Sequence, residues 1–119
     1  AGLSVAVVNS PVVKPLDAAT ILEAARPTQL VITAENHSVV GGLGSAVAEA
    51  MAEAGLGLRL LRIGLQDTFA ESGSREFLFD KYGLSVQAIV NAAWQALRPG
   101  TEVPQAPPQL AEPGTYAPV

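Results

Sequence analysis

Residues 30–54 read LVITAENHSVVGGLGSAVAEAMAEA, and this stretch decides the fold. Leu30 to Ala34 form an apolar run without polar alternation, which is typical of a parallel strand that is covered on both faces. A polar turn from Glu35 to Ser38 and a glycine cluster follow. Leu43 to Ala54 then repeat apolar residues at helical spacing, with glutamates on the opposite side. The stretch therefore predicts a central strand, a turn and an amphipathic helix.

The composition predicts one soluble globular domain and excludes several classes of protein. The chain has 119 residues, 49 % of them hydrophobic, which is enough for a single core. No apolar run approaches the roughly 20 residues that span a bilayer, so we expect no membrane contact. The absence of cysteine excludes thiolate chemistry and fits the cytoplasmic location that we expect. A net charge of −4 with scattered basic residues argues against nucleic-acid binding.

Two further apolar runs accompany the central strand. Leu3–Val8 and Arg59–Ile63 have the composition of strands, so with Leu30–Ala34 they predict a three-stranded sheet. Four helices are predicted from capping residues and helical spacing, starting near Asp17, Leu43, Ser74 and Ser85. Strands and helices alternate with short links, which favours a mainly parallel sheet with right-handed crossovers. The predicted fold class is therefore α/β.

The second half of the chain has shorter elements and ends in a proline-rich segment. Phe69 lies in a polar loop, and we expect its ring to fill a hydrophobic gap. Phe77 and Leu78 are predicted to face inward, and Trp94 lies beside an apolar helical stripe. Residues 99–119 carry six of the nine prolines, which predicts an extended tail. We therefore expect an α/β domain over residues 1–98 and a tail over residues 99–119.

The glycine cluster at Gly41, Gly42 and Gly44 has two interpretations. It follows a strand and opens a helix, as nucleotide-binding turns do. However, Val47 stands where the dinucleotide motif needs a third small residue, and no acidic residue ends the next strand. The alternative, which we favour, is that the glycines allow tight packing of strand and helix, or contact with a neighbouring chain.

His37 is the only histidine of the chain, and it follows Glu35 and Asn36 in the polar turn. A zinc site would need two or more carboxylates at unusual spacing. A general base oriented by Glu35 would lack a nucleophile motif. We therefore favour a hydrogen-bonding or interface role, and we predict no catalytic or metal-binding residue. The candidate residues for an interface or the rim of a site are Glu35, Asn36, His37, Gly41, Gly42 and Gly44.

Residues 71–74, ESGS, also have two interpretations. They could form an anion-binding nest at the start of a helix, or an ordinary helix cap. The cap is the better interpretation.

Three blocks resemble the C-terminal domain of the transketolase family. They are GLSVAVVNSPVVKPLD from Gly2, ITAENHSVVGGLGSAVAE from Ile32 and RIGLQDTFAESGSREFLFDKYGLS from Arg62. The blocks are most similar to the C-terminal section of split bacterial and archaeal transketolases. Deoxyxylulose-phosphate synthases share part of the third block but usually lack a histidine at the place of His37. The resemblance implies a three-layer α/β/α fold.

The family domain normally begins with a further strand and helix, which have no counterpart before Leu3. We therefore expect either a fragment of a longer product or a sheet that is completed in another way. A strand edge without a partner would make the chain self-associate. The alternative is that Leu3–Val8 and Leu30–Ala34 pair directly in a compact monomer.

The resemblance also implies a function. Enzymes of this family use thiamine diphosphate and a divalent cation such as Mg²⁺ to move a two-carbon ketol unit between sugar phosphates. Their pyrimidine- and pyrophosphate-binding domains hold the cofactor, and these domains are the implied partners, with homodimerisation. The sequence contains none of the family's cofactor motifs, so we expect a non-catalytic domain that serves assembly and the rim of the active site. The alternatives are a free-standing phosphate- or small-molecule-binding module, or the corresponding domain of deoxyxylulose-phosphate synthase.

Overall fold

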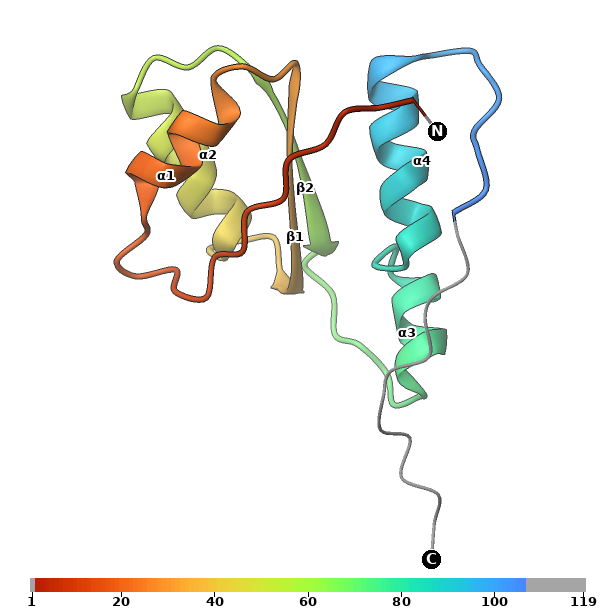
Figure 1. Cartoon of the computed structure of the whole chain (residues 1–119). Helices are drawn as coiled ribbons and strands as arrows, with labels where there is room; N and C mark the ends of the chain where they lie inside the picture. The colour runs from red at the N-terminus through yellow and green to blue at the C-terminus, as the bar shows by residue number, and fades with distance from the viewer. Residues whose placement is uncertain (1, 107–119) are drawn as a thin grey trace, which may run out of the picture.

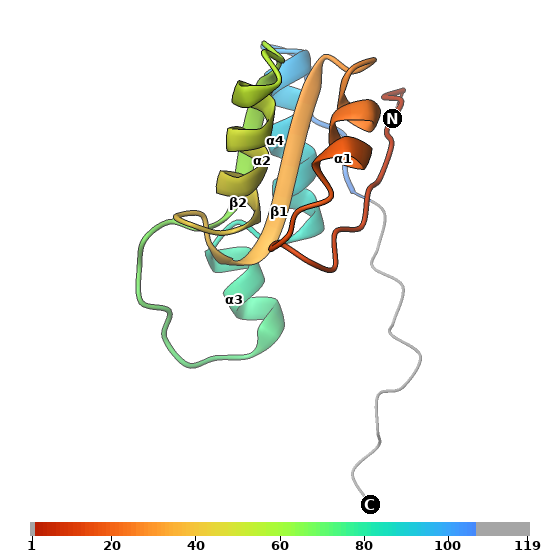
Figure 2. The same cartoon turned by 90° about the vertical axis from the view of Figure 1, so that its left-hand side faces the viewer.

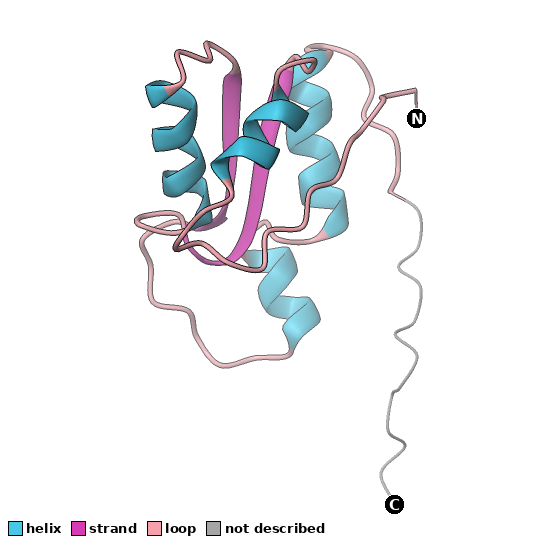
Figure 3. Ribbon diagram, turned by 60° about the vertical axis from the view of Figure 1, so that its left-hand side comes forward, coloured by secondary structure: helices cyan, strands magenta, loops and turns pink. Residues whose placement is uncertain are grey.

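The computed structural model describes residues 2–106 and contains two parallel strands and four helices within them. The elements are α1 (Ala18–Ala25), β1 (Leu30–Ser38), α2 (Leu43–Glu53), β2 (Arg59–Leu65), α3 (Arg75–Lys81) and α4 (Val86–Leu97). Figure 1 shows α1 and α2 on one side of the sheet and α4 on the other. Figure 3 shows the same strands enclosed by helices. The predicted α/β class with three layers is confirmed.

The four helices begin at the predicted capping residues or close to them. The side chains of Asp17, Ser74 and Ser85 each accept a hydrogen bond from the backbone N–H three residues further along. The cap interpretation of residues 71–74 is therefore confirmed at Ser74. Gly55 and Gly83 have φ angles of +64° and +72° directly beyond α2 and α3, as helix-ending glycines do.

The predicted strand at Leu3–Val8 is wrong. Within residues 2–106 this segment pairs with neither strand, and Val5 and Val7 are 74 % and 89 % exposed. A strand needs a neighbour at about 4.8 Å to pair its backbone N–H and C=O groups, and no strand of the described residues pairs with this segment. The alternative of direct pairing with Leu30–Ala34 therefore does not occur either. The described sheet has two strands instead of three.

β1 runs further than predicted, because Glu35 to Ser38 continue the strand instead of forming a turn. The ladder advances four residues from Ala34 to Ser38 on β1 while β2 advances only two. The extra residues form a bulge beside Gly64. A Cβ atom on Gly64 would lie 2.8 Å from the carbonyl oxygen of His37, so a glycine is required there.

The buried apolar side chains come from both sides of the sheet. They are Ala25, Val39, Val47, Met51 and Trp94. The expectation for Phe69 is wrong, because its ring is fully exposed, and Phe77 is also exposed on α3. Phe69 lies on the loop that leads from the sheet into α3, and Phe77 lies on α3 itself, where the ammonium of Lys81 stands 5.6 Å from the centre of its ring.

Residues after α4 return along that helix. The indole Nε1 of Trp94 donates a hydrogen bond to Oγ1 of Thr101 at 2.8 Å. The backbone N–H of Ala106 donates to Oε1 of Gln87 at 2.7 Å. The first part of the proline-rich segment thus contacts α4, and residues 107–119 lie outside the described part of the chain.

Candidate functional site

Glu35 closes the N-terminal end of α2. Its carboxylate accepts hydrogen bonds from the backbone N–H of Leu43 at 2.7 Å and of Gly44 at 2.9 Å. A helix leaves its first four N–H groups unpaired, and a negative charge is favourable there. The strand therefore supplies the anion that the start of the helix attracts. One interpretation of the turn, with His37 as a general base, required Glu35 to orient His37. The carboxylate of Glu35 instead binds the start of α2.

Gly42 and Gly44 allow this close approach. A Cβ atom on Gly42 would lie 2.0 Å from Oε2 of Glu35 and 2.8 Å from the carbonyl oxygen of Ser38. A Cβ atom on Gly44 would lie 2.8 Å from Oγ1 of Thr33. Real Cβ atoms essentially never come this close to another heavy atom, so both positions require glycine. The interpretation of these glycines as packing residues is confirmed.

A hydrogen-bonded network holds the turn between β1 and α2. Gly41 has a φ angle of +76°, which favours glycine, and its N–H donates to Oγ of Ser45 at 3.0 Å. The Ser45 hydroxyl donates to the carbonyl oxygen of Val39 at 3.0 Å. Arg62 from β2 donates through Nη1 to the same carbonyl oxygen at 3.1 Å. The turn is therefore fixed to α2 and to β2 at once.

Asn36 and His37 are exposed at the bulge. Nδ1 of His37 lies 3.0 Å from the carbonyl oxygen of Ser38, to which the ring N–H can donate. The structure thus gathers Glu35, Gly42 and Gly44 into one capping site and leaves Asn36 and His37 exposed outside it. Such exposed side chains can contact a partner but do not form a catalytic pair with Glu35.

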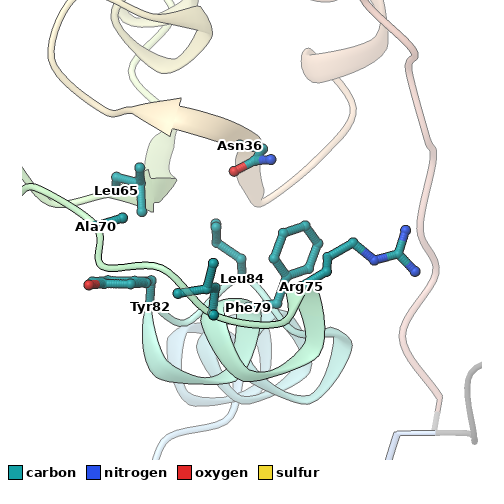
Figure 4. A pocket seen from close by; sticks show the side chains of 9 residues that line it. Asn36, Leu65, Ala70, Arg75, Phe79, Tyr82 and Leu84 are labelled. Atoms are coloured by element: carbon teal, nitrogen blue, oxygen red, sulfur yellow. The ribbon is translucent and has the colours of Figure 1, made fainter.

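A hollow of about 280 Å³ lies at the carboxyl ends of the two strands, above α3. Figure 4 shows Asn36 and Leu65 on the strand side and Phe79, Tyr82 and Leu84 on the opposite side. Its lining also includes Ala70, Gly73, Arg75 and Leu78. The sequence analysis missed this hollow, because residues from 36 to 84 form it and no local pattern joins them. The one signal available was that loops at the carboxyl ends of parallel strands gather functional residues.

The described residues do not fit a site for thiamine diphosphate and its cation. Within residues 2–106, no group of three or more histidine, aspartate or glutamate side chains is placed to hold a metal ion. The start of α2 is where a diphosphate would be expected to bind, but the carboxylate of Glu35 already takes two of its N–H groups. A diphosphate there would meet a negative charge of the chain itself.

No helix within the described residues is long and apolar enough to cross a membrane.

Comparisons with known proteins agree with the resemblance seen in the sequence. Residues 1–89 match the family described as transketolase, C-terminal domain. The chain is 48 % identical over 88 residues to a 1-deoxy-D-xylulose-5-phosphate synthase of Syntrophotalea carbinolica, which covers 74 % of this chain and 14 % of that protein. It is 45 % identical over 92 residues to a 6-deoxy-6-sulfo-D-fructose transketolase subunit of Clostridium sp., which covers 77 % of this chain and 28 % of that subunit.

A solved structure gives the same result. It is described as a split gene transketolase, inactive beta4 tetramer, and it matches with a TM-score of 0.64 and 45 % identity over 71 % of this chain and 27 % of that chain. The chain thus spans less than a third of the length of each of these three relatives. With a family match over residues 1–89 and the same fold in a relative of 45 % identity, the chain belongs to the transketolase C-terminal domain family.

Proposed function

We propose that this domain is the non-catalytic, C-terminal part of a thiamine-diphosphate-dependent transketolase. It contributes to the assembly of the enzyme and forms part of the rim of the active site. The whole enzyme transfers a two-carbon ketol unit between sugar phosphates in the cytoplasm. The pyrimidine- and pyrophosphate-binding domains or subunits of the same enzyme hold the cofactor and Mg²⁺. The observation that carries this proposal is at the start of α2, where the carboxylate of Glu35 already accepts the hydrogen bonds that a bound phosphate would need. The chain is also 45 % identical to a transketolase subunit.

The assembly role is supported by an open edge of the sheet. Among the described residues, β1 pairs with β2 alone, so the backbone groups along its other edge have no strand beside them. Such an edge is a template for a further strand, and the exposed Val5 and Val7 add apolar surface that a partner can cover. We propose that the chain forms homodimers as well as contacts with the cofactor-binding domains. The similar split gene transketolase is described as an inactive beta4 tetramer.

The second candidate is the corresponding domain of 1-deoxy-D-xylulose-5-phosphate synthase. The 48 % identity to such a synthase favours it. His37 favours the transketolase, since by resemblance the synthases usually lack a histidine at this position. A free-standing phosphate-binding module finds less support, because the glycine turn offers no open anion site.

Calorimetric titration of the purified 119-residue chain tests the proposal. We expect no binding of thiamine diphosphate with Mg²⁺, or of sugar phosphates, tighter than about 1 mM, and no ketol transfer. Sub-millimolar binding of a sugar phosphate would support the free-standing module instead. Measurable turnover by the chain alone would overturn the non-catalytic role.

A further inference from the structure

We propose that one face of α4 is a binding site for an extended, proline-containing peptide, and that residues 101–106 of this chain occupy it as a detachable internal ligand. The helix residues that form the site are Gln87, Asn91 and Trp94. The proposal rests on contacts within the chain, so it is independent of the function proposed above.

Gln87 pairs with the backbone of the segment as a neighbouring strand would. Its Nε2 donates a hydrogen bond to the carbonyl oxygen of Pro104 at 3.3 Å, and its Oε1 accepts one from the backbone N–H of Ala106 at 2.7 Å. The carbonyl and the N–H belong to residues two positions apart, which an extended chain presents on the same side. One side-chain amide therefore binds both groups together.

Asn91 fixes the orientation of that amide. Nε2 of Gln87 also donates to Oδ1 of Asn91, one turn further along α4, at 2.7 Å. An amide nitrogen carries two hydrogens, so it can make this bond and the bond to the segment at once. The amide is thereby held in the orientation that binds the peptide, which reduces the entropy cost of binding.

Trp94 binds the other end of the segment. Its indole Nε1 donates to Oγ1 of Thr101 at 2.8 Å. Gln87 and Trp94 are two turns apart on α4, which is about 10 Å along a helix. From Thr101 to Pro104 an extended, polyproline-like chain covers about 9 Å. The two attachment points on the helix therefore match the length of the segment between them.

A turn at the end of α4 directs the segment back onto the helix. Gly100 has a φ angle of +79° and follows Pro99, and the backbone N–H of Thr101 donates to the carbonyl oxygen of Arg98 at 3.3 Å. Proline followed by a glycine of positive φ is typical of a type II turn with this hydrogen bond. Figure 1 and Figure 2 both show the chain turning back here and returning beside α4.

The apolar residues of the segment are the ones that are covered. Val103, Pro104 and Ala106 are partly buried, whereas Glu102 and Gln105 are exposed. Proline suits its position, because the site uses its carbonyl oxygen and proline has no backbone N–H to leave unpaired. The site therefore favours an extended peptide with a proline whose carbonyl precedes a free N–H by two residues.

The segment is held by contacts that it can exchange. The hydrogen bonds that Gln87 and Trp94 make to it are all part-buried, so water can replace each of them when the segment leaves. The helix face then offers the same groups to another peptide of this kind. A separate peptide with the sequence of residues 99–106 should therefore bind there in place of the chain's own segment.

Amide hydrogen exchange of the full chain, followed by NMR, tests the docking of the segment. We expect the N–H of Ala106 to exchange at least about tenfold faster in Gln87→Ala than in the wild type, because its acceptor is lost. Gln95→Ala is the matched control, because Gln95 is an exposed glutamine of α4 that makes none of these hydrogen bonds. It should leave the exchange rate unchanged. Equal rates in the wild type and Gln87→Ala would overturn the docking.

A peptide titration tests the site itself. The full chain with Ala106→Pro lacks the N–H that Gln87 binds, so its own segment is weakened as a competitor. We expect the acetylated and amidated peptide PGTEVPQA, residues 99–106, to bind this variant with a dissociation constant of about 1–10 mM. The indole N–H resonance of Trp94, the only tryptophan, reports the binding.

The same peptide with Ala106→Pro is the control ligand, and it should bind at least about tenfold more weakly. Equal binding of the two peptides would overturn the role of Gln87, and no shift of the Trp94 resonance with PGTEVPQA up to about 10 mM would overturn the binding site. Circular dichroism verifies that each variant keeps its helix content.

Discussion

Gly42 and Glu35 approach so closely that a Cβ atom at position 42 would lie 2.0 Å from the carboxylate oxygen Oε2 of Glu35. The same oxygen accepts the N–H of Leu43 at 2.7 Å. Glu35 can therefore cap α2 only because position 42 is a glycine. Any side chain there would displace the carboxylate from the start of the helix. The bulge in β1 and the glycine cluster together form one capping site, built by residues seven to nine positions apart.

Replacement of Gly42 by alanine should destabilise the domain by about 2–3 kcal/mol, through a steric clash and the loss of the cap. The backbone angles of Gly42, φ −94° and ψ −157°, are open to alanine, so backbone strain would not add to these two effects. Urea unfolding measures it. Gly57→Ala is the control, because no atom lies within 4 Å of a Cβ atom there, and it should change the free energy of unfolding little. Equal effects at both positions would contradict the capping argument.

Glu35→Ala should cost about 1–3 kcal/mol of unfolding free energy, because it removes the acceptor of two backbone N–H groups. Glu35→Gln should cost less, since one oxygen remains to accept. Glu49→Ala is the matched control, because Glu49 is an exposed glutamate of α2 itself. If both alanine variants unfold at the same urea concentration, the carboxylate does not cap the helix.

The sequence predicted the helices well, because their signals are local. Asp17, Ser74 and Ser85 each cap the helix that follows, and Gly55 and Gly83 end the helix that precedes. Each of these signals works within about one helical turn of its residue. The helices could therefore be predicted without knowing what packs against them.

The sheet and the candidate site were predicted less well, because their contacts are distant in sequence. Leu3–Val8 has the composition of a strand, but strand formation depends on a partner that the segment does not meet within residues 2–106. Phe69 was expected to be buried by its hydrophobicity alone, and it lies on a loop that leaves the body. The role of Glu35 depends on a bulge that only the pairing with β2 creates.

His37→Ala should leave the free energy of unfolding within about 0.5 kcal/mol of the wild type. The side chain is exposed, and its hydrogen bond goes to the neighbouring carbonyl oxygen of Ser38. Thermal or urea unfolding checks this. If the variant unfolded, His37 would be a structural hydrogen-bonding residue, and its proposed place on the interface or rim would be wrong.

Low pH should destabilise the start of α1, because protonation of the Asp17 carboxylate weakens the N-cap of this helix. The hydrogen bond from the Thr20 hydroxyl, followed by that from the Thr20 backbone N–H, holds the pKa of this carboxyl below its ordinary value of 3.8. Because the folded pKa is lower than the unfolded one, the stabilisation is complete above pH 3.8 and is lost as the pH falls through the folded pKa. Asp17→Asn keeps a capping side chain that does not titrate. Its stability should therefore fall less than that of the wild type between pH 7 and acid, as measured by urea unfolding at each pH.

Thr33→Val should stabilise the domain by about 1 kcal/mol. Thr33 is 6 % exposed on β1, and its buried Oγ1 finds no hydrogen-bond partner within residues 2–106. A buried polar group without a partner costs about 1–3 kcal/mol, and valine has nearly the same shape and a higher strand propensity. Thr28→Val is the matched control, because the hydroxyl of Thr28 donates to the carbonyl oxygen of Ala25 at 2.7 Å. The two substitutions should shift the urea midpoint in opposite directions, upward at position 33 and downward at position 28. A downward shift at both positions would contradict the claim that the Thr33 hydroxyl is buried without a hydrogen-bond partner.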